Sequence, residues 1–462
     1  MNIDKGFLNV LILSTGFMLV FSAFQTMGTI EQSVLISIKE EDPTFTGSGY
    51  TSLAIIYAVF ATFNWLAPSY ISVTGPRISI LSGALCYTFF IATFLWPQTT
   101  LLYVASAIVG IGAALMWTGH GQYLTENSDA ETMTRNSGLF WAIFQLSLFG
   151  GNICAFFAFT EPTISESKRK MVFEVLTALA VIGTGVLLFM RSSPQMLVLG
   201  EAEGVSSADK ELRIPDKPRE KPLMAAWHAM RDAFQLFITP QILLLSMTFI
   251  YTGLELTFFS SVYPTSIGNS EQMGEYRKRY VPLAGICIGV GEVLGGAIFG
   301  ILGSKTKAFA GWPVVLTGFV MHIFVFIVVL LNLSDDSPIK DTAEIGYIKP
   351  SPALALVGSL VLGFGDACFN TQIYSLLGLL YSTESAPAFA LFKFCQSVAA
   401  AASFFYSSHF GLHIQLAILM LTLFFGTAAF CVVDLRNKRV NENSLSVIDT
   451  TQTDESSISE CT

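Results

Sequence analysis

The stretch GIGAALMWTG, from Gly110 to Gly119, decides the fold of this chain because a related stretch occurs in its second half. That stretch, GFGDACFNTQ, begins at Gly363, which gives an offset of 253 residues. The alignment also pairs Gly112 with Gly365. Similarity within one chain at a long, fixed offset indicates duplication of a structural unit.

A second pair of stretches supports the duplication. GLFWAIFQLS begins at Gly138 and ALFKFCQS begins at Ala390, and their Leu-Phe pairs align at an offset of 252. The two offsets differ by one residue although the segments are independent. We therefore expect the two halves of the chain to share one arrangement of elements.

The composition indicates that these elements are membrane-spanning helices. The chain has 462 residues, of which 52% are hydrophobic and 13% charged, with a mean hydropathy of +0.58; soluble domains carry about 25% charged residues. Apolar runs of roughly 20 residues, without the alternation of barrel strands, are long enough to cross a bilayer as helices. Twelve spans are predicted: 7–27, 51–71, 78–96, 101–124, 137–159, 171–190, 242–263, 281–303, 312–332, 352–380, 386–408 and 413–434.

The predicted fold class is an all-α membrane protein with two six-helix bundles. The bundles are expected over 1–190 and 242–434, joined by a polar, proline-containing linker over 191–241. The residues over 435–462 are rich in Ser, Thr, Asp and Glu, so we expect a disordered tail. Parallel repeats of this kind place a binding site near the membrane midplane between the halves.

The distribution of basic residues predicts cytoplasmic termini. With that orientation the inner segments hold 15 Lys and Arg and the outer segments hold 9, as the positive-inside rule requires. The sequon at Asn332 then lies on the outer side, which makes Asn332 a glycosylation candidate, although its closeness to the membrane opposes modification.

Several classes of function receive no support from the sequence. The net charge is -9 and no basic face exists, which argues against nucleic acid as a partner. We find no metal-ligand spacing, nucleophile motif or phosphate loop, so no cofactor and no enzymatic activity are expected. The predicted surroundings are the lipid bilayer.

The second half places charged side chains inside apolar spans. The stretch IGVGEVLGGAIFG, from Ile288 to Gly300, holds only Glu292, and at 1.5 Å per residue Glu255, Glu292 and Asp366 lie about 20, 16 and 21 Å deep. A lone charge at that depth costs about 2.5–3.5 kcal/mol or more. The functional interpretation is a proton- or cation-responsive cluster; the structural alternative is a neutral, hydrogen-bonded acid.

Lys393 lies only about 10 Å deep, where its flexible side chain reaches either a carboxylate or the inner surface. The glycines that surround Glu292 in its span have the spacing of close helix packing. We therefore expect a neighbouring helix to approach Glu292 and shield it from lipid.

Several longer stretches resemble the uncoordinated ninety-three-like (Unc-93-like) branch of the major facilitator superfamily. Among them are GAALMWTGHGQYLTENS from Gly112, YTGLELTFFSSVYP from Tyr251 and LGFGDACFNTQIYSLLGLLYS from Leu362. The resemblance covers both halves and implies the major facilitator fold. We count Asn370, within the last stretch, as a further cavity candidate.

The resemblance also implies two kinds of function. The superfamily implies transport of a small solute, whereas relatives in this branch are associated with regulation of a potassium channel or with escorting receptors to endosomes. The plasma membrane and the endolysosomal membrane are both compatible with the sequence.

The gate loops depart from the superfamily pattern. Facilitator transporters carry an Asp in the loop between spans two and three, but here that loop reads SVTGPRIS, with Arg77 and no Asp. The equivalent loop, GILGSKTKAFAG, offers Lys305 and Lys307. The missing acid favours a non-transporting role, and the midplane acids favour transport, so both hypotheses stay open.

Overall fold

The computed structural model describes residues 5–158, 166–192, 222–275, 277–305, 311–407 and 409–459, and these residues form helices joined by turns and loops. The helices of the first half are α1 (Lys5–Glu41), α2 (Gly49–Phe63), α3 (Ala67–Thr74), α4 (Pro76–Thr93), α5 (Thr99–Glu126), α6 (Met133–Gln145), α7 (Ser147–Ala158) and α8 (Glu166–Leu187). Those of the linker and second half are α10 (Pro222–Phe237), α11 (Pro240–Thr257), the π-helical turn η1 (Phe258–Val262), α12 (Tyr263–Asn269), the short 3-10 turns η2 (Glu271–Met273) and η3 (Arg277–Arg279), α13 (Tyr280–Lys305), α14 (Trp312–Asn332), α15 (Pro352–Leu380), α16 (Ser385–Ser407) and α17 (Leu412–Ser459).

The predicted spans correspond to these helices, with three of them interrupted. Within the described ranges, ten helices are long and apolar enough to cross a membrane, and the bent pair α2 and α3, which meet at 63°, gives an eleventh if it is one span. The span predicted over 137–159 is divided at Leu146 into α6 and α7. The span predicted over 242–263 contains η1 and continues into α12.

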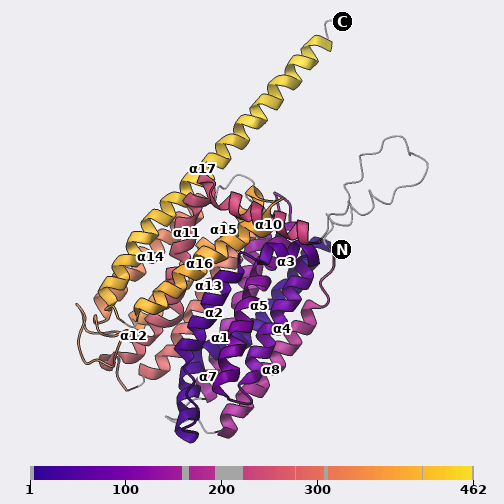
Figure 1. The fold of residues 1–462 in the computed structure, drawn as a ribbon. Coiled ribbons are helices and arrows are strands. Elements are labelled where there is room, and N and C mark those ends of the chain that lie inside the picture. Colours follow the sequence, from indigo (N-terminus) through magenta and orange to yellow (C-terminus); the bar gives the residue numbers. More distant parts are fainter. Residues whose placement is uncertain are drawn as a thin grey trace.

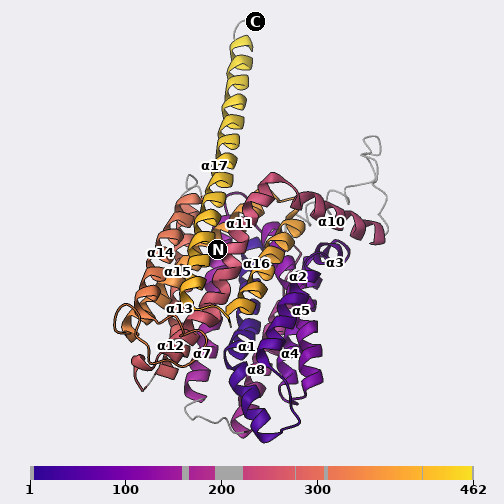
Figure 2. The same cartoon turned by 60° about the vertical axis from the view of Figure 1, so that its left-hand side comes forward.

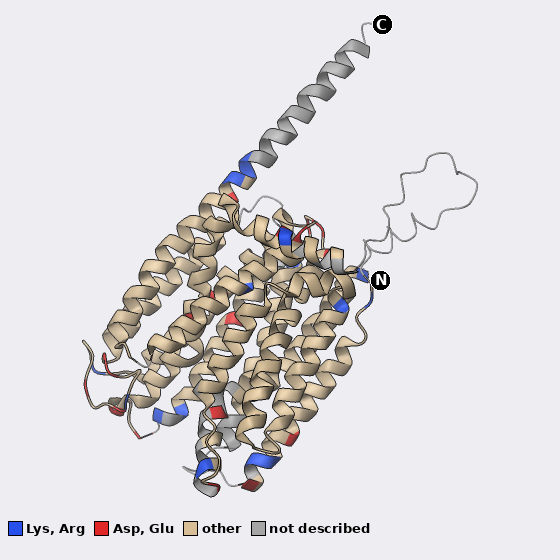
Figure 3. Ribbon diagram, in the orientation of Figure 1, with Lys and Arg blue, Asp and Glu red and all other residues tan. Residues whose placement is uncertain are grey.

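The two halves of the chain form adjoining bundles (Figure 1). Helix α1 begins, and α17 leaves the bundle, at the same end of the molecule (Figures 1 and 2). We call this end proximal and the opposite end distal. Lys, Arg, Asp and Glu gather at the two ends, with few in the middle of the helices (Figure 3), which is the distribution expected of a chain that crosses lipid.

The aligned glycines of the repeat make equivalent contacts. A Cβ on Gly110 would lie 2.7 Å from the carbonyl oxygen of Ile56 on α2, and one on Gly363 would overlap the carbonyl oxygen of Ile288 on α13. Gly112 and Gly365 each face the preceding span of their own half, at Cys86 on α4 and His322 on α14. These glycines let backbones approach where a side chain would separate the helices. The equivalence supports the duplication read from the sequence.

Two helices extend into the ranges expected to be linker and tail. Helix α10, within the linker, lies across the proximal end (Figure 2) and contacts both α3 and α16. Helix α17 has its last residue at Ser459, within the range 435–462, for which a disordered tail stays a prediction.

Candidate functional site

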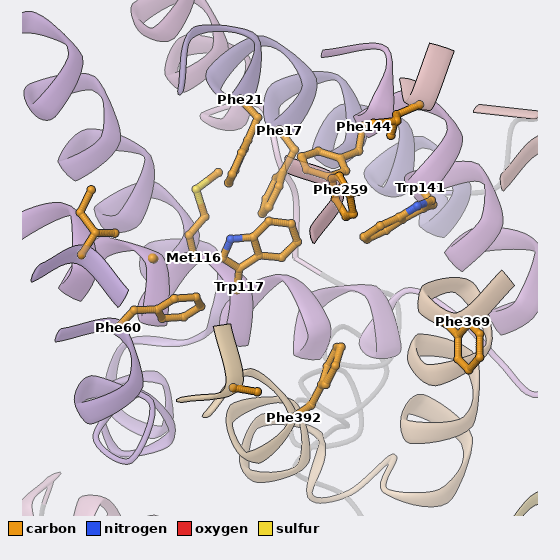
Figure 4. Packing of buried hydrophobic residues seen from close by; sticks show 14 of the residues in the cluster. Phe17, Phe21, Phe60, Met116, Trp117, Trp141, Phe144, Phe259, Phe369 and Phe392 are labelled. Carbon is orange, nitrogen blue, oxygen red and sulfur yellow. The ribbon is translucent and has the colours of Figure 1, made fainter. Parts of the chain in front are cut away.

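A cavity of about 350 Å³ lies between the two bundles. Its wall contains residues of α1, α2, α5 and α6 from the first half and of α11, α13, α15 and α16 from the second. Ten of the lining side chains are aromatic: Phe21, Phe24, Tyr57, Phe60, Tyr87, Trp117, Trp141, Phe144, Phe259 and Phe404. Figure 4 shows the Trp117 indole at the centre of this packing beside Phe17 and Phe21.

The structure brings the three midplane acids together. Asp366 and Asn370, one turn apart on α15, both line the cavity, and Asn370 Nδ2 donates a 2.7 Å hydrogen bond to Asp366 Oδ1. Glu255 and Glu292 carry carboxyls that lie close enough to Asp366 to interact with it electrostatically. Like charges so close disfavour one another, so the three acids favour a state in which part of them is protonated.

Glu292 is held by the opposite bundle. Trp141 Nε1 on α6 donates a 2.6 Å hydrogen bond to Glu292 Oε2, and Gln145 Nε2 donates to the same oxygen. Gly296, one turn further along α13, packs against the backbone of α6. The glycines around Glu292 thus bring α6 close enough to supply both donors, as the sequence led us to expect of a shielding helix.

Glu255 is fully enclosed and contacts a histidine that sequence reasoning left without a role. Within the described residues, no nitrogen or hydroxyl donor hydrogen-bonds either oxygen of Glu255. His322 Nε2 lies 3.9 Å from Glu255 Oε1 and 3.1 Å from the carbonyl oxygen of Leu362, and His322 Nδ1 pairs with the Tyr251 hydroxyl. His322 stands alone in its apolar span, and only the packing of α11, α14 and α15 brings it beside these groups.

Lys393 turns into the cavity rather than toward the proximal surface. Its Nζ donates a 2.8 Å hydrogen bond to Gln396 Oε1 and lies 4.4 Å from the centre of the Trp117 ring on the opposite bundle. A cation over an indole face is stabilised by the ring quadrupole. Lys393 and Asp366 therefore place opposite charges in the same wall.

The gate-loop and glycosylation candidates lie apart from the cavity. Arg77 is the second residue of α4, which begins at Pro76 after Gly75, whose φ of 81° favours glycine. Arg77 Nη1 lies 3.4 Å from Ser192 Oγ. Lys305 is the last residue of α13, and Lys307 lies outside the described residues. Asn332 is 1% exposed, and its amide bonds the backbone of Ser351 in both directions. Attachment of a glycan there would require release of both bonds.

An aromatic cluster lies at the proximal end, between the bend of α2 and α3, the linker helix α10 and α16. Trp65, between α2 and α3, lies 5.6 Å from Phe237 of α10 and 5.1 Å from Phe394 of α16, measured between ring centres. Phe234 of α10 lies 6.5 Å from the same indole. We call these four residues the proximal aromatic cluster. It joins both bundles through the linker helix, at the end where the gate loops lack an acid.

Replacement of Trp65 by alanine is expected to open the proximal side. The change removes three ring contacts, each contributing about 0.5–1.5 kcal/mol, so labelling of Cys395 by an impermeant maleimide from that side should rise roughly tenfold. Cys395 is a suitable reporter because it follows Phe394 and is 7% exposed. Trp227→Ala, on α10 but 61% exposed, is the control and should leave labelling unchanged; equal effects of the two variants would contradict the prediction.

No metal site emerges from this geometry. In the part of the chain that the structure describes, no group of three or more His, Cys, Asp or Glu side chains is arranged to hold a metal ion.

Fold and cavity together define a multi-pass membrane protein of the major facilitator type. The structure of the E. coli fucose:proton symporter FucP matches with a TM-score of 0.59 at 12% identity, over 93% of this chain and 99% of that one. A FucP structure in the outward conformation matches with a TM-score of 0.58. At this identity the likeness concerns the fold alone.

The chain belongs to the UNC-93 family. A sequence model of that family, described as "Ion channel regulatory protein UNC-93", matches residues 42–431. The chain is 45% identical to UNC93-like protein MFSD11 of Xenopus laevis, over 93% of this chain and 96% of that protein. It is 26% identical to UNC93-like protein 3 of Arabidopsis thaliana, over 89% of this chain and 82% of that protein.

Proposed function

We propose that this protein is a secondary transporter that moves a small solute through the cavity between its bundles. The observation that carries the proposal is the contact of Asp366, in the cavity wall, with Glu255 and Glu292 behind it. Such a chain of carboxyls holds and passes protons when one member faces a wet space. Proton movement along it would then be coupled to solute binding.

The proposed orientation has both termini in the cytoplasm, so the proximal end is the inner one. The excess of Lys and Arg in the proximal segments supports it. The membrane is the plasma membrane or the endolysosomal membrane. The proposed role is not enzymatic, which the fold and family support.

Uptake into liposomes tests this proposal. Purified protein is reconstituted, a pH gradient is imposed, and a panel of labelled solutes is screened for accumulation that depends on the gradient. Glu255→Gln keeps the shape of the side chain but removes its titrating group, so we expect gradient-driven uptake to fall by at least about tenfold at unchanged protein yield. The exposed Glu271→Gln is the control, and accumulation as fast in Glu255→Gln as in the control would contradict proton coupling.

A second candidate function is regulation of another membrane protein. The family description supports it, as does the absence of an acid from the gate loop around Arg77. In this role the protein would bind an ion-channel subunit, a potassium channel being the candidate partner, or would escort a receptor between membranes. Stable co-purification of a channel subunit, with no flux for any solute tested, would favour this function over transport.

A further inference from the structure

A buried glutamate in the distal part of the cavity has no part in the contacts described so far. Glu31 of α1 lines the cavity and is 1% exposed. It lies four residues beyond the apolar span Lys5–Met27. We propose that the cavity takes an organic cation, whose ammonium group is bound by Glu31 and whose apolar body lies against the aromatic wall. This inference rests on the proposed function, because it takes the cavity as the solute-binding site.

The Glu31 carboxyl lacks a donor. Within the described chain, neither of its oxygens receives a hydrogen bond from a nitrogen or hydroxyl donor. Its polar neighbour is the Ser52 hydroxyl, which lies 3.0 Å from Ser106 Oγ. Ser106 also donates to the carbonyl oxygen of Leu102, so the single Ser52 proton is shared between Ser106 and the Glu31 carboxyl. The Ser52 contact lowers the pKa of Glu31 by less than burial raises it.

Burial favours the neutral form of Glu31 when the cavity holds no cation. A protonated Glu31 can donate to Ser52, whereas an ionised one has only the shared Ser52 proton as compensation. Burial raises the pKa of Glu31 to about 8, against the smaller lowering by the Ser52 contact. A ligand cation would supply the missing positive charge, and Glu31 would release its proton as the cation binds.

The cavity wall suits the apolar part of such a ligand. Phe21, Phe24, Met27 and Glu31 follow one face of α1 at steps of three or four residues, so an aromatic stripe leads to the carboxyl. The Phe24 ring lies 4.7 Å from that of Tyr87 across the bundle. Aromatic faces attract alkylammonium groups, and they also pack against the apolar carbon of a ligand.

The charges of the wall also favour a cation at the distal end. The lining residues include two carboxyls, Glu31 and Asp366, and one ammonium, that of Lys393. Lys393 lies against Trp117, which contacts Phe21. Glu31 is ten residues further along α1, about 15 Å away. The ligand ammonium can thus bind Glu31 without approaching Lys393.

Equilibrium binding to the purified full-length protein in detergent tests this inference. The probe is benzyltrimethylammonium, and its neutral isostere is neopentylbenzene, in which carbon replaces the charged nitrogen. We expect the wild type to prefer the ammonium by at least about tenfold, and Glu31→Gln to lose at least about tenfold in affinity for the ammonium alone. Glu271→Gln, an exposed glutamate at the distal end, should change neither affinity.

The pH dependence supplies an independent readout. The ammonium binds the ionised form of Glu31, so its affinity should fall by up to about tenfold for each pH unit below about 8. The other titratable groups that face the cavity are Asp366, Lys393, Tyr57 and Tyr87. All four remain in Glu31→Gln, in which we expect this dependence to disappear.

Several results would overturn the inference: equal affinity of the wild type for the two probes, no ammonium binding, or unchanged binding in Glu31→Gln. If that variant does not fold, Tyr57 provides the second test. Tyr57→Leu removes an aromatic face from the wall and should weaken ammonium binding, whereas Tyr57→Phe should retain it; equal binding by the two variants would also overturn the inference. Ammonium binding without uptake in liposomes would overturn transport alone.

Discussion

Replacement of Gly291 by valine is expected to leave no folded protein. A Cβ at this position on α13 would overlap the carbonyl oxygen of Leu360 on α15, and the backbone nitrogen of Phe364 lies 2.7 Å from the same point. Both obstacles are backbone atoms, so no side-chain rotation relieves the overlap. The helices must separate, at a cost of about 3 kcal/mol or more, the upper end for overpacked cores.

Size-exclusion chromatography of the detergent-solubilised protein measures this effect. We expect the monodisperse peak of the wild type to be lost in Gly291→Val. Gly185→Val is the matched control, because no atom lies within 4 Å of the equivalent Cβ on α8. A normal peak and melting temperature for Gly291→Val would show that the contact between α13 and α15 is looser than described.

Asp366→Asn is expected to abolish proton-coupled uptake while the protein still folds. The variant removes the acid that both lines the cavity and lies beside Glu255 and Glu292. Glu255 and Glu292 then have no titrating neighbour that connects them to the cavity. It also removes the opposite charge in the wall near Lys393. An uncompensated Lys393 at such depth costs about 2.5–3.5 kcal/mol, so a lower melting temperature is expected beside the loss of uptake. Uptake in liposomes under a pH gradient is the measurement.

A double variant separates the two roles of Asp366. Asp366→Asn combined with Lys393→Gln removes both charges, so any loss of stability caused by an uncompensated lysine should be restored. If Asp366 carries protons, uptake remains absent in the double variant. If Asp366 serves only to balance Lys393, uptake should return, and its return would contradict the proposed proton path.

Much of the fold follows from the sequence because lipid leaves few options. Runs of about 20 apolar residues must become helices, and the repeat around Gly110 and Gly363 predicted two similar halves. Helix α10 was not predicted, since Pro215, Pro218 and Pro222 made its surroundings read as an extended linker. It is stabilised by its contacts with α3 and α16, which lie far from it in the sequence.

The candidate site was only partly accessible to the same reasoning. Depth along a helix identified Glu255, Glu292 and Asp366, because a charge inside an apolar run is costly wherever it points. Their closeness depends on the packing of α11, α13 and α15, which a single sequence does not specify. Glu31 was missed for a different reason: it follows the apolar run, where a charged residue is ordinary, and only the packing around Ser52 buries it.

The wide turn η1 changes which residues of the seventh span lie on the same face before and after the turn. A π-helical turn accommodates one residue more than an α-helical turn, so everything beyond Val262 is rotated by about 100° relative to a continuous α-helix. Ser260 and Ser261 of the turn and Thr265 beyond it all border the cavity. A helical wheel that treats Pro240 through Asn269 as one continuous α-helix would therefore assign the wrong residues of α12 to the cavity lining. Substitutions in α12 must be chosen from a wheel that begins after η1.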